Sequence, residues 1–298
     1  RTMTITKHKK RRSDELWGTI FAGIPVLAMI VFTYVPMGMA VVLSFMESEG
    51  GSISSATFLP INRIFDNYVT VLSDKYFWGS LLNNLILMLE LPVSIILSVL
   101  IAELLTKKVR GTKFFKVLLF VPYVCSVTAT TFMWNWLLNS QYGLVNKIIG
   151  VSIDWFSPDN FIWSIMIMGL WATCGYRILL FTAALTNVNG TLKEAASIDG
   201  ANKLQIFTHV TLPAITPTIF YVLVMGTIGV LQSFTRIQVL DPQGQKCLTA
   251  VFYIYKESIA GSRYGVGCAA SIVLALIVAG LTKLNFTLSK KWVNYDVA

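Results

Sequence analysis

The stretch KEAASIDGANKLQIFTHVTLPAITP, residues 193–217, is a polar segment between two of the most apolar runs of the chain. Just before it, Thr191 is followed three residues later by Glu194, a spacing typical of a capping box at the start of a helix. Gly200 then interrupts a helix-permissive run, at a place where a tightly turned backbone is easiest for glycine. The pattern predicts two short helices joined at Gly200.

The second of these helices carries an apolar stripe. Leu204, Phe207 and Val210 follow one another at three-residue steps, and Pro213 and Pro217 end the helix and open the next apolar run. These apolar side chains need a cover, which either the chain's own spans or a partner protein can provide.

The chain around this segment has the composition of a membrane protein. Of its 298 residues, 55% are hydrophobic and 13% are charged, with a mean hydropathy of +0.65. Soluble domains carry about 25% charged residues. A helix crosses the hydrocarbon with roughly 20 apolar residues, and six runs are long enough. We expect an all-α integral membrane fold with spans at about 17–45, 78–105, 117–138, 162–185, 216–234 and 264–286.

The positive charges predict the orientation of these spans. The net charge is +9, but Lys and Arg gather beside apolar runs, as membrane topology requires, which argues against nucleic-acid binding. Sixteen of the 24 fall at the two ends and in the loops after spans two and four, seven fall in the opposite loops, and Arg177 lies within a span. We therefore expect both termini and the quoted segment in the cytoplasm. The expected organisation is a basic segment at 1–15, one membrane domain at 16–290 and a tail at 291–298.

The sequence offers little for catalysis. His8 and His209 are far apart, and no motif pairs a nucleophile with a base. The four cysteines show no paired spacing, which disfavours a metal site or disulfide. No phosphate-binding glycine loop is present, so no ATPase is expected in this chain. Without a catalytic motif, the chain is predicted not to be an enzyme and to hold no cofactor of its own.

The segment also matches a known motif. Glu194-Ala195-Ala196, three residues, Gly200, nine residues, Val210, one residue, Leu212-Pro213 resembles the EAA loop in permease subunits of bacterial ABC importers, with Val210 at a position where the family has isoleucine. Residues 67–89, 120–149, 233–240 and 264–278 resemble the sugar-type branch, which imports maltose, oligosaccharides and glycerol phosphate. Two departures lie in the outer loops: residues 241–244 replace a Thr-Gly-Gly-Pro-like turn, and an enlarged insertion of some maltose-type members is missing.

The resemblance implies a coupling role for the loop at 187–213. In the family, this helix pair lies between spans four and five and seats in a groove of a cytoplasmic ATPase. The residues implied at this contact are Glu194, Ala195, Ala196, Asp199, Gly200, Leu204, Phe207, Leu212 and Pro213. The Glu194 carboxylate has two competing roles, as a cap of its own helix and as a contact with the ATPase.

The resemblance also implies the other subunits. They are a second, homologous permease, two ATPases that hold ATP and Mg, and an extracytoplasmic solute-binding protein. The implied function is ATP-driven import of a sugar by alternating access in the bacterial inner membrane. The alternatives are a non-sugar solute, an integral membrane enzyme and a membrane scaffold without transport.

Polar and aromatic residues inside spans predict the solute path, because such groups are expensive in a membrane. The candidates from residue type and from family sugar-site positions are Asn135, Trp171, Thr173, Tyr176, Arg177, Gly226, Gly229, Gln232 and Ser233. Three alternatives stay open. Gly226 and Gly229 can serve close helix packing instead. Arg177 can pair with Glu90 or contact a partner subunit, or it can bind an acidic solute such as a uronate or sugar phosphate.

Overall fold

The computed structural model describes residues 8–48, 52, 55–107 and 111–294. The expected basic segment at 1–15 and the tail at 291–298 fall partly outside this range. The described chain divides into two compact units, one of residues 1–71 with 257–272 and one of residues 72–256 with 273–298.

The first unit contains the most exposed of the apolar helices. The helix at Trp17–Leu43 has no buried residue in its most apolar window, and a π-turn at η1 interrupts it. Asn67 ties the unit together, since its side-chain amide donates to the backbone carbonyls of Ser44 and Met46. The elements are α1 (His8–Met29), η1 (Ile30–Tyr34), α2 (Val35–Leu43), β1 (Met46–Ser48), β2 (Ala56–Phe58), η4 (Ile61–Arg63), α3 (Asp66–Ser73), η6 (Lys256–Ala260) and the start of α16 (Tyr264–Ser289). The antiparallel pair β1–β2 is a small addition to the all-α fold that the sequence predicts.

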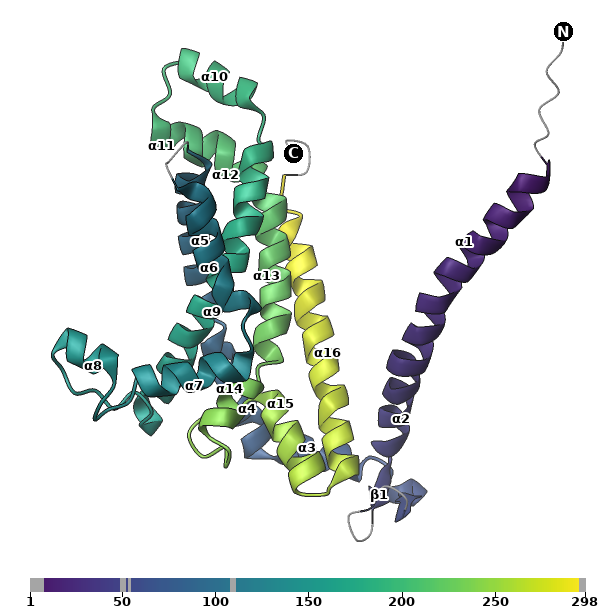
Figure 1. The fold of residues 1–298 in the computed structure, drawn as a ribbon. Coiled ribbons are helices and arrows are strands. Elements are labelled where there is room, and N and C mark those ends of the chain that lie inside the picture. The colour runs from purple at the N-terminus through teal and green to yellow at the C-terminus, as the bar shows by residue number, and fades with distance from the viewer. Residues whose placement is uncertain (1–7, 49–51, 53–54, 108–110, 295–298) are drawn as a thin grey trace. The chain divides into compact units, whose positions relative to one another are not determined.

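The second unit is a bundle of long helices with short helices at its ends (Figure 1). Its elements are α4 (Lys75–Leu87), α5 (Glu90–Thr106), α6 (Thr112–Val124), α7 (Val127–Leu137), α8 (Leu144–Ile149), α9 (Pro158–Asn187), α10 (Gly190–Ile198), α11 (Lys203–Ile206), η5 (Phe207–Thr211), α12 (Leu212–Ala214), α13 (Thr216–Leu231), α14 (Thr235–Leu240), α15 (Ala250–Tyr255) and the rest of α16.

Small residues let the helices of this bundle approach closely. Helix α5 packs along α9 with Ser94, Ser98 and Ala102 fully buried. Helix α6 also packs along α9, where a Cβ added at Gly175 would collide with the backbone of Leu119. These contacts fix α9 as the central helix of the unit.

Five described helices are long and apolar enough to cross a membrane, and a sixth span exists if α6 and α7 are counted together. This agrees with the predicted number. The predicted third span is not one straight helix, however. Helices α6 and α7 meet at an angle of 101°, because Cys125 has an extended backbone and Ser126, with ψ of 131°, is also non-helical. The predicted span over 117–138 thus consists of two helices joined at a sharp bend.

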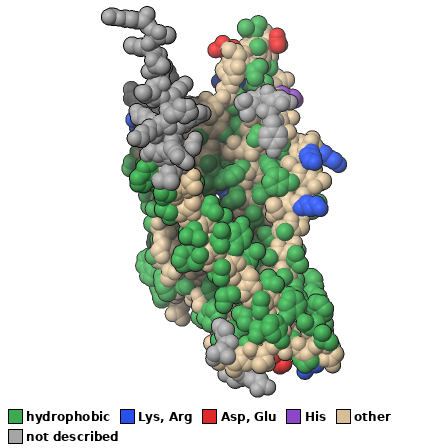
Figure 2. Space-filling model, turned by 90° about the vertical axis from the view of Figure 1, so that its right-hand side faces the viewer, with side chains coloured by type: hydrophobic (Ala, Val, Ile, Leu, Met, Phe, Trp, Pro, Cys, Tyr) green, Lys and Arg blue, Asp and Glu red, His purple; other side chains and the backbone are tan. Residues whose placement is uncertain are grey.

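Figure 2 shows hydrophobic side chains along much of one face of the molecule, with acidic side chains at its top. Figure 1 places α10 at the same end. The polar segment that separates the two apolar helices α9 and α13 is therefore displayed at one end of the bundle.

Candidate functional site

A cavity of about 450 Å³ lies among α5, α6, α7, α9, α13 and α14, all within the second unit. Its volume falls within the range of about 300–1,000 Å³ that is usual for small-molecule sites. The lining combines aromatic, polar, charged and small apolar side chains: Glu90, Tyr123, Val127, Gly169, Thr173, Tyr176, Arg177, Tyr221, Val222, Met225, Gly226, Gly229, Val230, Ser233, Phe234, Thr235 and Arg236.

The cavity lies near the middle of the long helices. Thr173 and Tyr176 are close to the midpoint of the span Pro158–Asn187, and Gly229 is close to the midpoint of Thr216–Leu240. Glu90 lies halfway along Lys75–Thr106. Polar groups from three spans therefore meet where a bilayer's hydrocarbon core is deepest, a position in which they are expensive unless they serve a function or each other.

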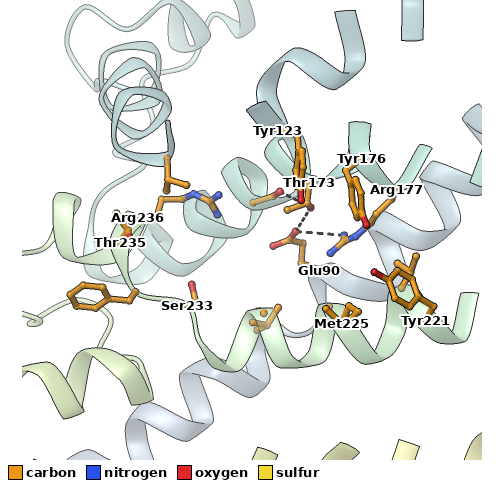
Figure 3. Close-up of a pocket in the computed structure, with 17 residues that line it drawn as sticks. Glu90, Tyr123, Thr173, Tyr176, Arg177, Tyr221, Met225, Ser233, Thr235 and Arg236 are labelled. Atoms are coloured by element: carbon orange, nitrogen blue, oxygen red, sulfur yellow. Dashed lines mark hydrogen bonds and ion pairs between the residues drawn. The ribbon is translucent and has the colours of Figure 1, made fainter. Parts of the chain in front are cut away.

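Three charged side chains gather at one side of the cavity (Figure 3). A Glu90 carboxylate oxygen lies 4.0 Å from Nη1 of Arg177, and Thr173 Oγ1 donates to the same oxygen at 3.4 Å. The Arg236 guanidinium lies on the opposite side of Glu90 from Arg177. Gly169 makes room for this group, because a Cβ there would collide with the Glu90 carboxylate and lie 3.1 Å from Nη1 of Arg236.

Three tyrosines also line the cavity, with Tyr176 beside Arg177 (Figure 3). The rings of Tyr123 and Tyr176 stack with centroids 4.7 Å apart and planes 12° from parallel. Tyr221, from α13, lines the same cavity. Stacked phenol rings provide both a flat apolar face and hydroxyl groups, which suits a ligand that is apolar on one face and polar at its edges.

The structure brings six of the nine predicted path residues to this cavity: Thr173, Tyr176, Arg177, Gly226, Gly229 and Ser233. The other three, Asn135, Trp171 and Gln232, are exposed and do not line it. Trp171 packs edge-on against Trp134 instead. Their placement in the path of this chain is therefore not supported by the geometry.

The two glycines differ in their surroundings. A Cβ at Gly226 would collide with the side chain of Leu91, so this glycine permits close packing of α13 on α5. A Cβ at Gly229 would have no heavy atom within 4 Å. The packing alternative thus applies to Gly226, and Gly229 faces open space in the cavity wall.

Sequence reasoning missed several lining residues. Met225 and Tyr221 lie about one and two turns before Gly229 on α13, and Tyr123 comes from the broken third span. Arg236 was assigned to an outer loop, but helix α14 continues span five through Leu240 and brings Arg236 to the cavity. The helical spacing from Gly229 to Arg236, about two turns, was the available signal for it.

The polar segment folds as two short helices joined at Gly200, as predicted, and Gly200 has a left-handed backbone with φ of +82°. The predicted capping box at Thr191 was wrong. The N-cap of helix α10 is Asn189, two residues before Thr191. The Asn189 side chain accepts a hydrogen bond from the backbone N–H of Thr191 at 3.0 Å. A capping box does occur at α11, between Asn202 and Gln205.

This arrangement leaves Glu194 exposed and without a hydrogen bond or ion pair to any residue that the structure describes. Apolar side chains beside it are also uncovered. Ile198 is 86% exposed, Leu204 is 70% exposed and Leu192 is 42% exposed. We call these three residues the exposed loop surface.

The remaining loop residues divide between the two faces. Ala195 and Asp199 are exposed, and Ala196 and Pro213 are half-buried. Phe207 and Leu212 pack onto the chain's own apolar core, made of Ile95, Val99, Ala102, Ile178, Phe181, Leu185, Ile215 and Val222. Phe207 therefore differs from the expectation that it joins Leu204 on an outward face.

The comparisons with known proteins agree with this architecture. Residues 85–290 match the family model described as the inner membrane component of binding-protein-dependent transport systems. The chain belongs to this family. It is accordingly a permease subunit, a multi-pass component of the inner membrane.

Relatives align along nearly the whole length of this permease. It is 28% identical to the probable ABC transporter permease protein YesP of Bacillus subtilis, over 98% of this chain and 96% of that protein. It is 27% identical to the sn-glycerol-3-phosphate transport system permease protein UgpA of Yersinia enterocolitica, over 94% and 96% of the two chains. A solved bacterial ABC transporter involved in import of the acidic polysaccharide alginate contains a chain of the same fold, with a TM-score of 0.80 at 22% identity over 95% and 98% of the two chains.

Proposed function

We propose that this permease carries a sugar across the inner membrane through the mid-span cavity, as one of two permease subunits in an ATP-driven importer. Similar permeases are named for sn-glycerol 3-phosphate, for diacetylchitobiose and for multiple sugars. A solved relative is a complex with an alginate-bound periplasmic protein. The proposal includes such a solute-binding protein, a second permease and two ATPases that hold ATP and Mg.

The cavity carries the proposal. Polar and aromatic side chains meet midway along the two helices, α9 and α13, that flank the polar loop. In a chain that only needed to sit in the membrane, these positions would favour apolar residues. A wetted cavity at mid-membrane, lined from several spans, is the place where a transporter holds its solute between the two sides of the bilayer.

The exposed loop surface supports the coupling half of the proposal. Leu192, Ile198 and Leu204 are exposed apolar side chains on two short helices, and the exposed Glu194 carboxylate has no hydrogen bond or ion pair to the described residues. Because Asn189 caps α10, Glu194 is available for a charged contact with an ATPase. Gly200 sets the angle between the two helices that such a partner would meet.

A packed route joins this loop to the cavity. Phe207 and Leu212 rest on the apolar core that includes Ile178 and Val222. Val222 also lines the cavity, and Ile178 directly follows the cavity residue Arg177. In the proposed mechanism, ATP binding draws the loops of the two permeases together, the core transmits this movement to α9 and α13, and the cavity opens to the outer side. Hydrolysis then reverses the movement.

The charge distribution supports a cytoplasmic loop. Sixteen Lys and Arg residues fall on the side of the termini and loop 187–213, against seven in the opposite loops; one of the seven, Arg236, lies at the cavity within the span Thr216–Leu240. Moving Arg236 out of the opposite loops strengthens the bias. The proposed orientation has both termini and the loop in the cytoplasm.

Uptake into proteoliposomes tests the proposal. The permease is reconstituted with the other subunits of its system, and entry of radiolabelled sugars is measured with and without ATP. Tyr176→Ala should lower the rate about 5- to 30-fold, since it removes a stacking face and a hydroxyl worth about 1–2 kcal/mol together. Trp171→Leu, on the same helix but outside the cavity, should keep the rate within about twofold. ATP-independent entry, or equal losses in the two variants, would contradict the assignment.

A further inference from the structure

The cavity holds more positive than negative charge. Of the lining residues, Arg177 and Arg236 are cationic and Glu90 alone is anionic. The formal charge of the lining is therefore +1. A charge in a span is expensive unless it faces a counter-charge or a watery cavity, so the unmatched positive charge calls for an anion that the described part of this chain does not supply.

Arg177 has the strongest unmet requirement. The residue is 93% buried, since its relative exposure is 7%. Its Nη1 atom is buried and has no hydrogen-bond partner among the described residues. The Glu90 oxygen at 4.0 Å is within range of an ion pair but too far for a hydrogen bond. Leaving such a donor unmet is costly, and the group is directed into the cavity (Figure 3).

Arg236 approaches the same carboxylate from the other side. Its guanidinium makes no hydrogen bond to the described residues and faces Glu90 across the space that Gly169 leaves open. The Glu90 carboxylate thus lies between two guanidinium groups and accepts a hydrogen bond from neither of them. Each guanidinium keeps N–H donors in a planar fork, the geometry that binds carboxylate and phosphate groups through paired hydrogen bonds.

The tyrosine wall supplies the complementary surface. Tyr123 and Tyr176 present stacked rings, and Tyr221 adds a third phenol to the cavity lining. A sugar ring has an apolar face for such a wall and hydroxyls for its edge. From these two surfaces we infer that the cavity takes a sugar bearing an anionic group, a carboxylate or a phosphate, which Arg177 and Arg236 hold while the ring rests on the tyrosines. This inference rests on the proposed function as a sugar permease.

The inference assigns Glu90 a positioning role. It keeps both guanidinium groups at the cavity wall when the site is empty, without neutralising them fully. A neutral sugar would leave the net charge of the cavity uncompensated. A carboxylate from a second permease subunit could also compensate it, and the experiment below separates that case from a charged cargo.

The experiment compares uptake of matched sugars by the complete transporter in proteoliposomes. The panel pairs neutral mono- and disaccharides with their uronates, such as galactose with galacturonate, and with their phosphates, such as glucose with glucose 6-phosphate. The measured quantity is the ratio of initial rates, acidic over neutral, for the wild type and for Arg177→Gln, Arg236→Gln and Glu90→Gln. Because every sample contains the same solute-binding protein, its own selectivity cancels between variants.

The wild type should import the acidic member of at least one pair faster than the neutral member. Arg177→Gln and Arg236→Gln should each lower the acidic-to-neutral ratio about tenfold or more, the effect of losing a charge-assisted hydrogen bond. Glu90→Gln should keep or raise the ratio. Lys283→Gln removes a positive charge from an exposed site on α16 and should leave the ratio unchanged. The uronate and phosphate arms identify which anion is taken.

Two results overturn the inference. One is faster uptake of the neutral members throughout, which leaves the sugar function standing. The other is an unchanged ratio in the arginine variants that assemble with the partner subunits, which places the counter-charge in the second permease. Arg236 is only half-buried, so its variant provides the test even if Arg177→Gln does not assemble. Absence of any sugar uptake by the wild type would refute the proposed function together with the inference.

Discussion

Gly226 and Gly229 lie one turn apart on α13, yet the structure predicts opposite effects for the same substitution. In Gly226→Ala, the new methyl would collide with the buried Leu91 side chain of α5. Overpacking of this kind costs about 1–3 kcal/mol, and the better helix propensity of alanine offsets about 1 kcal/mol of it. In Gly229→Ala, the methyl meets no atom within 4 Å, so only the propensity gain of about 1 kcal/mol applies.

The two variants should therefore differ by about 1–3 kcal/mol in the free energy of unfolding, with Gly229→Ala the more stable. At about 2–4 °C per kcal/mol, the midpoint of thermal unfolding should differ by at least about 2 °C. The assay is thermal unfolding of the purified transporter in one detergent, followed by size-exclusion chromatography. Adding Leu91→Ala to Gly226→Ala should cost less than the sum of the two single changes, because it removes the colliding atoms.

Transport provides the second readout for the same pair. Gly229→Leu should assemble normally but reduce solute uptake, since its Cβ meets no heavy atom within 4 Å and its side chain would take up space at the cavity wall. Equal midpoints for Gly226→Ala and Gly229→Ala, or loss of assembly in Gly229→Leu, would refute the view that one glycine packs helices and the other borders the solute.

Three further predictions concern the loops. Asn189→Ala removes the cap of α10 and should weaken that helix by about 0.5–2 kcal/mol, seen as faster amide hydrogen exchange in residues 190–198, whereas Thr191→Ala should change exchange less. Glu194→Gln should leave that exchange unchanged but lower solute-stimulated ATP hydrolysis by the complex; unchanged hydrolysis would argue against an ATPase contact. Burial, aided by the charge of Asp241, raises the pKa of the Cys247 thiol to about 12, so between pH 7 and 9 it should stay protonated and react with maleimide only after denaturation, as mass spectrometry can show.

Much of the fold follows from the sequence because a bilayer imposes simple rules. Apolar length predicts the spans, and the interruption at 187–213 predicts short surface helices because glycine and proline act locally. Gly200 illustrates this, because a glycine between two helix-permissive runs predicts a tight turn, and its backbone is left-handed. The position of Thr173, Tyr176 and Gly229 at the cavity follows from polar or small residue types in the middle of apolar helices.

The errors arise where tertiary contacts decide. A run such as 117–138 has the same composition whether it is straight or bent, and the break at Cys125 depends on how α6 and α7 pack rather than on hydropathy. Asn189, and not Thr191, is the N-cap of α10. Both residue types are common N-caps, so the sequence alone does not choose between them. Arg236 was missed because charge alone suggests an outer loop, and only the folded position of α14 brings it beside Glu90.

Cysteine accessibility at Gly229 tests most directly whether the cavity is the solute path. In a variant without the four native cysteines, Gly229→Cys is treated with a membrane-impermeant thiol reagent, in the complete transporter, with and without ATP and the transported solute. The proposed path predicts that labelling of Gly229→Cys depends on the nucleotide state and is slowed by the solute. Labelling of Leu276→Cys, on an exposed part of α16 outside the cavity, should change with neither ATP nor solute. Labelling of Gly229→Cys that neither ATP nor solute alters would contradict it.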